Sequence, residues 1–320
     1  MITAYLAAEG FEAELAEELR RAGLGPMLRP AHGQLFITDA EPIEAAWSLN
    51  TWFDAEELEV GSIGETARSL RARQRNWSSY APLHRGRAEL VTAKLPHVSG
   101  RPLALAEPPP VAPLGSWTML ETGRVLAATR CSSPFPNGRP ALQERRQGPP
   151  SRAYLKLWEA LLRIRRRPGP GDVCVDLGAS PGGWTWLLSE LGASVLAVDK
   201  APLDASVARR PKVSWRGESA FGLRPNSLSD TEPITWVFSD IACYPQRLLA
   251  LVDQWRALQP APALLFTVKF QGATDHEVTD QLRAMEGAEL FHLFHNKHEL
   301  TLAIVGPHRA SRERAEPVQP

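Results

Sequence analysis

The segment between residues 173 and 191 constrains the fold of this chain more than any other. Val173–Leu177 has the apolar pattern of a buried strand, small residues follow from Gly178 to Gly183, and Trp184–Leu191 has the pattern of a helix. Backbone N–H groups in such a turn can approach a ligand closely, because few Cβ atoms stand in the way. This order of elements predicts a cofactor site at the end of a strand in an α/β sheet.

Strands and helices alternate through the rest of the second half of the sequence. The alternation predicts a doubly wound, mainly parallel sheet. The other predicted strands are Ser194–Val198, Trp236–Ser239, Ala263–Val268, Glu289–Leu293 and Glu299–Val305. The other predicted helices are Ala153–Ile164, Pro245–Ala257 and His276–Met285.

The first part of the chain predicts a smaller α/β module. Its predicted strands are Ile2–Ala7, Gln34–Thr38, Ala88–Ala93, Trp117–Glu121 and Arg124–Thr129, and its predicted helices are Phe11–Ala22 and Pro42–Phe53. Residues 132–150 are rich in Pro, Gly, Ser and Arg without an apolar period, which indicates a boundary. We therefore expect an N-terminal domain over 1–135, a second domain over 136–308 and a loose tail over 309–320.

Charge is distributed unevenly along the 320 residues, although 36 Lys and Arg balance 36 Asp and Glu. Residues 1–66 hold 13 acidic residues and three arginines, whereas residues 139–167 hold nine basic and two acidic residues. A basic cluster attracts phosphates, but charge alone fits a solvated face equally well. The arginines that we expect to contact RNA phosphates are Arg145, Arg146, Arg152, Arg165, Arg166 and Arg167.

Two acidic residues flank the predicted cofactor turn. Asp176 precedes the turn, and Asp199 follows the next strand, where an acid can accept hydrogen bonds from ribose hydroxyls. The turn lacks the Gly-x-Gly-x-x-Gly spacing that accommodates a diphosphate, and Asp176 suits a positively charged amino-acid tail. These features favour S-adenosylmethionine over NAD as the cofactor.

Asp-Leu-Gly-Ala-Ser-Pro-Gly-Gly-Trp at residues 176–184 resembles the first motif of the FtsJ-like (RrmJ-type) RNA ribose 2′-O-methyltransferases. Further matches occur in the family's order around Lys156, Asp240 and Lys269, and Glu299 falls where the family has its final acid. The resemblance is specific over residues 151–305. It implies a Rossmann-like S-adenosylmethionine-dependent methyltransferase fold with those four residues as the catalytic tetrad. The chain is most similar to the RlmM branch, which implies a cytidine of large-subunit (23S) ribosomal RNA as the substrate and a THUMP-like, RNA-binding N-terminal module.

The resemblance also implies a set of cofactor-binding residues, with two departures from the branch. Ala153 stands where the branch has a serine that contacts the cofactor, and either Glu218 or Ser219 must replace its acid near the adenine. The implied residues are Asp176, Gly178, Ser180, Pro181, Gly182, Gly183, Trp184, Asp199, Glu218, Ser219 and Asp240. The indole of Trp184 is better explained by packing than by stacking on a base.

Methyl transfer to a ribose hydroxyl requires a group that removes the hydroxyl proton. Lys269 at the end of a strand is the expected base, and a purely electrostatic role for it stays open.

Two other functions compete with this interpretation. Cys243 could attack a cytosine ring in an RNA cytosine-5 methyltransferase, or the chain could be an inactive RNA-binding protein on a methyltransferase scaffold.

Several other classes of protein are disfavoured by the sequence. Its uncharged stretches are too short for a membrane span, and the N-terminus lacks the pattern of a signal peptide. The three cysteines lie far apart without a nearby histidine cluster, so we expect reduced thiols and no metal site. We therefore expect a cytosolic protein whose partner is ribosomal RNA or a pre-ribosomal particle.

Overall fold

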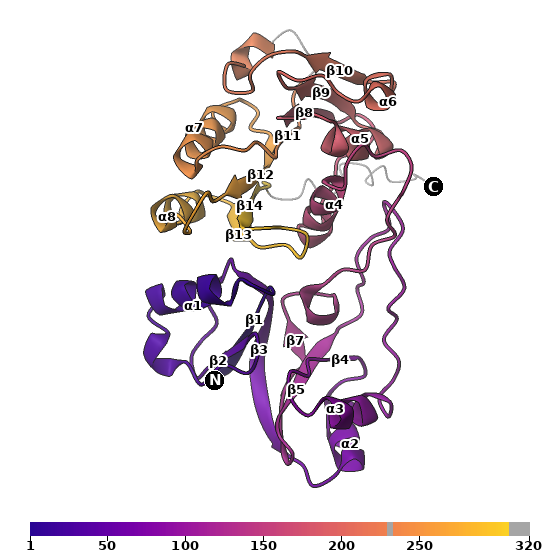
Figure 1. The fold of residues 1–320 in the computed structure, drawn as a ribbon, viewed down its shortest axis with the longest axis vertical. Helices are drawn as coiled ribbons and strands as arrows, with labels where there is room; N and C mark the ends of the chain where they lie inside the picture. The colour runs from indigo at the N-terminus through magenta and orange to yellow at the C-terminus, as the bar shows by residue number, and fades with distance from the viewer. Residues whose placement is uncertain (229–232, 307–320) are drawn as a thin grey trace, which may run out of the picture.

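The computed structural model describes residues 1–228 and 233–306, which form two seven-stranded sheets that follow one another along the chain (Figure 1). The strands of the first sheet lie between residues 2 and 131, and those of the second between residues 173 and 304. The tail predicted at 309–320 lies outside the described residues.

The second sheet has the strand order β10-β9-β8-β11-β12-β14-β13. The first five strands in this order are parallel, and β14 is antiparallel to both of its neighbours. The predicted doubly wound, mainly parallel sheet is therefore confirmed. Its strands are β8 (Val173–Leu177), β9 (Ser194–Val198), β10 (Val213–Arg216), β11 (Trp236–Ser239), β12 (Ala263–Lys269), β13 (Ala288–Phe291) and β14 (Glu299–Ile304).

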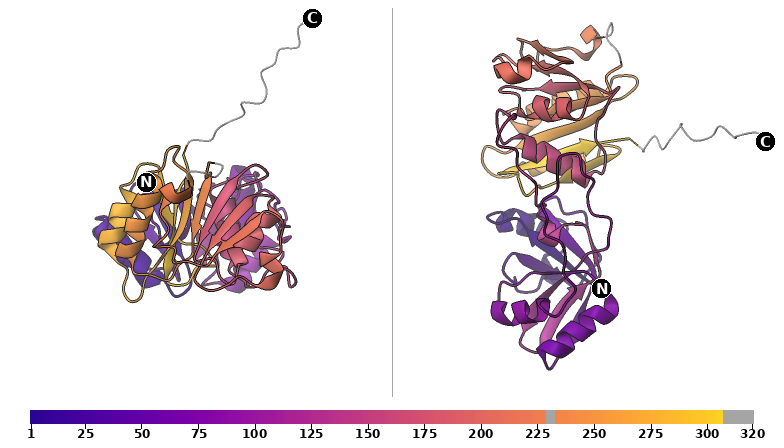
Figure 2. Two further views of the ribbon diagram at one scale, coloured as in Figure 1. Left: turned by 90° about the horizontal axis from the view of Figure 1, so that it is seen from above. Right: turned by 90° about the vertical axis from the view of Figure 1, so that its right-hand side faces the viewer.

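Helices cover both faces of the second sheet (Figure 2). Cys174 of β8 packs in one hydrophobic cluster with residues of α4 and α5, whereas the next residue, Val175, packs in another cluster with residues of α7 and α8. Successive side chains of a strand point to opposite faces, so burial of both faces explains why these strands are largely apolar. The helices are α4 (Tyr154–Arg163), α5 (Gly183–Glu190), α6 (Ala205–Ala208), α7 (Pro245–Arg256) and α8 (His276–Arg283).

The first sheet has the order β2-β1-β3-β6-β5-β4, with β7 also paired to β3. The long strand β3 pairs with β1, β6 and β7 and so joins the two ends of this sheet. Its strands are β1 (Ile2–Ala7), β2 (Leu35–Thr38), β3 (Ser48–Glu59), β4 (Trp77–Ser79), β5 (Gly115–Glu121), β6 (Arg124–Ala128) and β7 (Arg130–Cys131). The helices beside it are α1 (Glu12–Arg21), α2 (Ile63–Arg73) and α3 (Arg85–Thr92).

Two predictions for the N-terminal module are wrong. The helix predicted at Pro42–Phe53 is replaced by the start of β3, whose residues 48–52 are all buried and leave no exposed helical face. The strand predicted at Ala88–Ala93 is part of α3, in which Ala88 and Val91 are buried while Leu90 is exposed. Burial at a spacing of three is the pattern of a helix, not of a strand.

The hydrophobic core is continuous between the two sheets. Leu15, Leu19 and Trp47 of the N-terminal module pack in the same cluster as Val268 of β12 and Leu300 of β14. Two segments of the chain, residues 93–114 and 132–153, cross the space between the two sheets (Figure 1). The N-terminal module therefore contacts the ends of the strands that border the site described next.

Candidate active site

Four side chains predicted as a tetrad meet at the carboxyl edge of the parallel strands. Lys156 Nζ lies 3.0 Å from Asp240 Oδ1 and 2.6 Å from Glu299 Oε1. Lys269 Nζ lies 3.0 Å from the same Asp240 oxygen and donates to the Asp240 carbonyl oxygen at 2.6 Å. The structure thus brings together residues that span more than 140 positions of the sequence.

The topology of the sheet explains this convergence. Asp240 directly follows β11, and Lys269 is the last residue of the adjacent parallel strand β12. Glu299 is the first residue of β14, where the antiparallel register pairs it with Lys269. Lys156 comes from the first turn of α4, which packs over the same edge.

Charge in the cluster is balanced between two amines and two carboxylates. Burial raises the pKa of Asp240, but the charges of Lys156 and Lys269 and their hydrogen bonds outweigh it and hold that pKa below its usual value. Glu299 is 6% exposed, and the backbone N–H of Lys297 donates to its carboxylate. The arrangement keeps Asp240 ionised between the two amines.

The glycine turn requires glycine at two positions. Gly178 has a φ of +77°, and a Cβ there would lie 2.5 Å from Ile241 Cγ1. Gly182, with a φ of +113°, precedes the first residue of α5 and packs against Val207. Residues with a Cβ rarely adopt these conformations, so both positions favour glycine. Because glycine has no side chain, the backbone N–H groups at the N-terminus of α5 stay accessible to a ligand.

Asp176 lies below this turn and is fully buried. Its Oδ2 accepts a hydrogen bond of 2.6 Å from Thr185 Oγ1, a contact that the sequence pattern did not predict. Burial raises the pKa of Asp176 to about 7, and the nearby carboxylates of Asp240 and Asp199 add to the rise. A cationic group at this place would relieve the cost of ionising Asp176.

Asp199 stands on the other side of the turn. Its carboxylate accepts hydrogen bonds from the backbone N–H groups of Ser180 and Ala201, at 3.0 and 2.9 Å. Glu218 follows β10 at the same edge and pairs with Arg216 at 2.6 Å. These acids are placed where a nucleoside could lie along the strand ends.

The remaining turn residues are held by local contacts. Ser180 Oγ donates to the carbonyl oxygen of Pro202 at 2.9 Å. The indole of Trp184 is buried and donates to the carbonyl oxygen of Ala153, so this side chain packs inside the fold. Ser219 accepts backbone hydrogen bonds from Gly222 and Leu223 through its carbonyl oxygen.

Ser151 is a site residue that the sequence analysis missed. Its Oγ is buried against Gly183 and has no hydrogen-bond partner within the described part of the chain. It lies two residues before Ala153, the position at which the branch has its serine. A buried hydroxyl without a partner beside the turn is a fitting contact for a polar ligand.

The six arginines predicted to contact RNA fall into different places. Arg152 precedes α4 near the site and pairs with exposed Glu144 at 2.7 Å, and Arg146 is exposed close by in the sequence. Arg145 contacts Glu190 at the end of α5. The three arginines after α4 instead lie where the parallel strands begin: Arg166 donates to the carbonyl oxygen of Gly306, beyond the end of β14.

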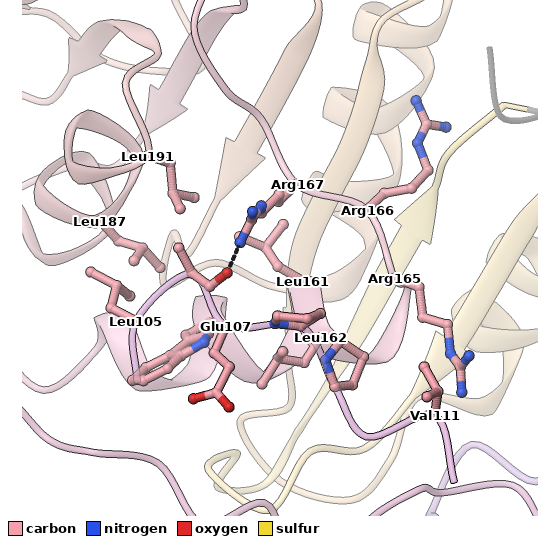
Figure 3. Close-up of a pocket in the computed structure, with 14 residues that line it drawn as sticks. Leu105, Glu107, Val111, Leu161, Leu162, Arg165, Arg166, Arg167, Leu187 and Leu191 are labelled. Atoms are coloured by element: carbon pink, nitrogen blue, oxygen red, sulfur yellow. Dashed lines mark hydrogen bonds between the residues drawn. The ribbon is translucent and has the colours of Figure 1, made fainter. Parts of the chain in front are cut away.

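Arg165, Arg166 and Arg167 line a cavity of about 320 Å³ between α4, α5 and the chain crossing at residues 105–111 (Figure 3). Arg167 donates to the carbonyl oxygen of Ala106 in that crossing. Apolar side chains such as Leu161 and Leu187 form the rest of the wall. Trp158, Leu161 and Leu162 of α4 line this cavity, and none of the four tetrad residues does.

Cys243 is a poor nucleophile in this fold. It is 8% exposed in the core between β-sheet and helices, and burial raises the pKa of its thiol although Arg247 and Lys269 act in the opposite direction. A catalytic cysteine needs its pKa lowered.

Among the described residues no group of His, Cys, Asp and Glu has the geometry to hold a metal ion, and no helix there is long and apolar enough to cross a membrane.

A doubly wound sheet with a glycine turn after β8 and a Lys–Asp–Lys–Glu cluster at its carboxyl edge defines a Rossmann-like methyltransferase. The family model of the FtsJ-like methyltransferases matches residues 149–311, and the chain belongs to this family.

Curated relatives resemble the chain over the same region. The ribosomal RNA large subunit methyltransferase M of Halorhodospira halophila is 37% identical over 188 residues, which cover 56% of this chain and 53% of that protein. The protein of the same name from Alkalilimnicola ehrlichii is 33% identical over 200 residues, covering 58% of this chain and 54% of its own. The chain thus spans about half the length of the curated relatives it matches.

Among solved structures, this chain is similar to a ribosomal RNA methyltransferase from Plasmodium falciparum. It covers 48% of this chain and 96% of its own, with 15% identity and a TM-score of 0.38.

Proposed function

We propose that this protein is an S-adenosylmethionine-dependent methyltransferase that modifies a ribose 2′-hydroxyl of RNA. The observation that carries the proposal is the charged cluster at the strand edge that also holds the glycine turn. In this cluster Lys156 and Lys269 both contact Asp240, and Lys156 also contacts Glu299. The family membership of the chain supports the same reaction.

The residues around the turn suit the proposed cofactor. Asp176 would face the cationic amino-acid end, since its raised pKa reflects a buried acid without a cation. Asp199 would accept from the ribose hydroxyls, and Ser151 Oγ offers a further polar contact. Glu218 or Ser219 would serve near the adenine. Bound S-adenosylmethionine supplies a methyl group on a sulfonium, which a ribose oxygen displaces in line.

The tetrad would orient the hydroxyl and remove its proton. Lys269 would take the proton from the 2′-oxygen after it has given up its own proton, while Asp240 fixes both amines near the methyl donor and stays paired with Lys156. Lys156 and Glu299 orient the ribose from the other side of Asp240. A general base within hydrogen-bond reach of the attacking oxygen is what this chemistry needs.

We further propose a cytidine of 23S ribosomal RNA as the target, because relatives at 37% and 33% identity bear the name ribosomal RNA large subunit methyltransferase M. The N-terminal module would bind the RNA, as a THUMP-like module does, within a domain that ends near residue 135. An enzyme acting on ribosomal RNA or a pre-ribosomal particle belongs in the cytoplasm.

A methyl-transfer assay with unmodified ribosomal RNA tests this function. The protein is incubated with labelled S-adenosylmethionine, the RNA is digested to nucleosides, and the labelled atom is identified. We expect label on ribose that is lost in Lys269→Ala and kept in Cys243→Ala. Label on a pyrimidine ring would establish the cytosine-5 alternative, and cofactor binding without any transfer would favour an inactive RNA-binding protein.

A further inference from the structure

One aromatic ring of the N-terminal module contacts the neighbours of two tetrad residues. The indole of Trp47 lies 5.9 Å from the ring of Phe270 and 5.5 Å from that of His298, measured between ring centroids. Phe270 directly follows Lys269, and His298 directly precedes Glu299. Trp47 is 1% exposed, so it is packed against both from within the core.

Phe270 and His298 are also joined to each other. The backbone N–H of Phe270 donates to the carbonyl oxygen of His298 at 3.2 Å, one step beyond the register pair Lys269 and Glu299. Their rings lie 5.5 Å apart. A shift of either residue would therefore move the end of β12 and the start of β14 relative to each other.

The N-terminal module holds Trp47 firmly. The carboxylate of Glu18 accepts hydrogen bonds from the backbone N–H groups of Ala46 and Trp47, at 2.8 and 2.9 Å, and pairs with Arg283 of α8 at 2.5 Å. The carbonyl oxygen of Ala46 accepts from the backbone N–H of His292 at 2.6 Å. These bonds fix the indole relative to the loop at residues 292–298.

The same loop is held from the opposite side by the helix that carries Lys156. Glu159, three residues further along α4, accepts from the backbone N–H groups of Phe294 and His295, at 2.7 and 3.0 Å. His298 adds a close approach to the N-terminal module: its Nε2 lies 3.2 Å from Glu14 Oε1, without the alignment of a hydrogen bond, and the two form an ion pair when the imidazole is protonated. The loop before Glu299 is thus clamped between α4 and the N-terminal module.

We propose that Trp47 and Glu14 are positioning residues of the methyl-transfer site, through which the N-terminal module sets the placement of Lys269 and Glu299. The inference rests on the proposed function. Neither residue touches the reacting atoms, since each acts through Phe270 or His298. A small displacement of a catalytic group can cost orders of magnitude in rate, because the reacting atoms must be aligned.

The test compares Trp47→Ala, Trp47→Phe and Glu14→Gln in the full chain, with Glu17→Gln as the control on the same helix. Within residues 1–228 and 233–306, Glu17 forms an ion pair with Arg20, three residues along α1. We expect Trp47→Ala to lower kcat by on the order of tenfold or more while the Kd for S-adenosylmethionine stays within about twofold. Trp47→Phe restores most of the rate, Glu14→Gln lowers kcat with KM for RNA unchanged, and Glu17→Gln has no effect.

Unchanged kcat in both Trp47→Ala and Glu14→Gln would overturn the inference, as would a loss confined to KM for RNA. Amide hydrogen exchange of Phe270 gives a readout that needs no activity, because its N–H is bonded to the His298 carbonyl. We expect faster exchange in Trp47→Ala. If the wild-type chain transfers no methyl group, the proposed function fails, and unchanged Phe270 exchange in Trp47→Ala would then refute the positioning role separately.

Discussion

At the scale of single residues, Asp240 organises the site because one carboxylate oxygen lies 3.0 Å from each of two lysines. The position directly after a buried strand gives it backbone rigidity, and the carbonyl oxygen of the same residue accepts from Lys269. An aspartate in this place thus ties a helix and a strand together while it stays ionised. The neighbouring turn depends on the opposite property, the lack of a side chain.

Gly178→Ala should destabilise the protein by about 1–2 kcal/mol from backbone strain alone, because an L-residue is placed at a left-handed φ. Overlap of the new methyl group with Ile241 adds to this loss and should close the turn to ligands. Urea unfolding and calorimetric titration with S-adenosylmethionine measure both effects. Gly169→Ala is the matched control, since a Cβ there meets nothing within 4 Å; equal stability of the two variants would contradict the prediction.

Asp176 should make the stability of the protein depend on pH in an unusual direction. Its pKa is raised by burial to about 7 in the folded state, whereas the pKa of an aspartate in the unfolded chain is about 3.9. The folded state therefore keeps a proton that the unfolded state has lost, so this contribution to stability is complete below about pH 4 and is lost as pH rises through about 7. Urea unfolding across this range should show a shallower decline in Asp176→Asn. An identical pH slope in variant and wild type would refute the assignment.

At the scale of elements, apolar patterns predicted six of the seven strands of the second sheet and missed β10, whose residues are mostly exposed. They were less successful for the N-terminal module. Strands such as β8 and β12 are buried on both faces between helices, so their largely apolar runs identify them. Strand β3 is buried over residues 48–52 and alternates only later, which resembles a short helix in sequence. Its identity depends on pairing with β1, β6 and β7, which come from distant parts of the chain.

The site followed the same division. Motifs next to strand ends located the tetrad and the turn, because the topology of a doubly wound sheet brings such ends together. Thr185 and Trp47 carry no motif, and only their contacts with Asp176 and Phe270 mark them. Ser151 begins the matched segment around Lys156, but only its contact with Gly183 gives it a role. Contacts between modules cannot be inferred from local patterns, which explains why Trp47 was placed in a helix instead of against the active site.

At the scale of the whole molecule, the unequal distribution of charge bears on which arginines would face the proposed RNA substrate. Arg146 and Arg152 are exposed near the start of α4, on the side of the tetrad. Arg165 and Arg167 follow the far end of that helix, and Arg167 is bonded to a carbonyl oxygen of the crossing chain. If RNA binds with a ribose at Asp240, the first pair should contribute more phosphate contacts than the second.

Substitution of both residues in each pair by alanine tests this expectation. Affinity falls as salt rises, and each lost phosphate contact makes the plot of log K against log salt less steep by about 0.7–0.9, because fewer counterions are released on binding. We expect Arg146→Ala with Arg152→Ala to reduce the steepness of this plot by about one to two and to weaken binding to ribosomal RNA at low salt. Arg165→Ala with Arg167→Ala removes the same formal charge and should leave the slope nearly unchanged. Equal losses in the two double variants would mean that RNA covers both edges of the sheet, and no loss in either would place the RNA surface elsewhere.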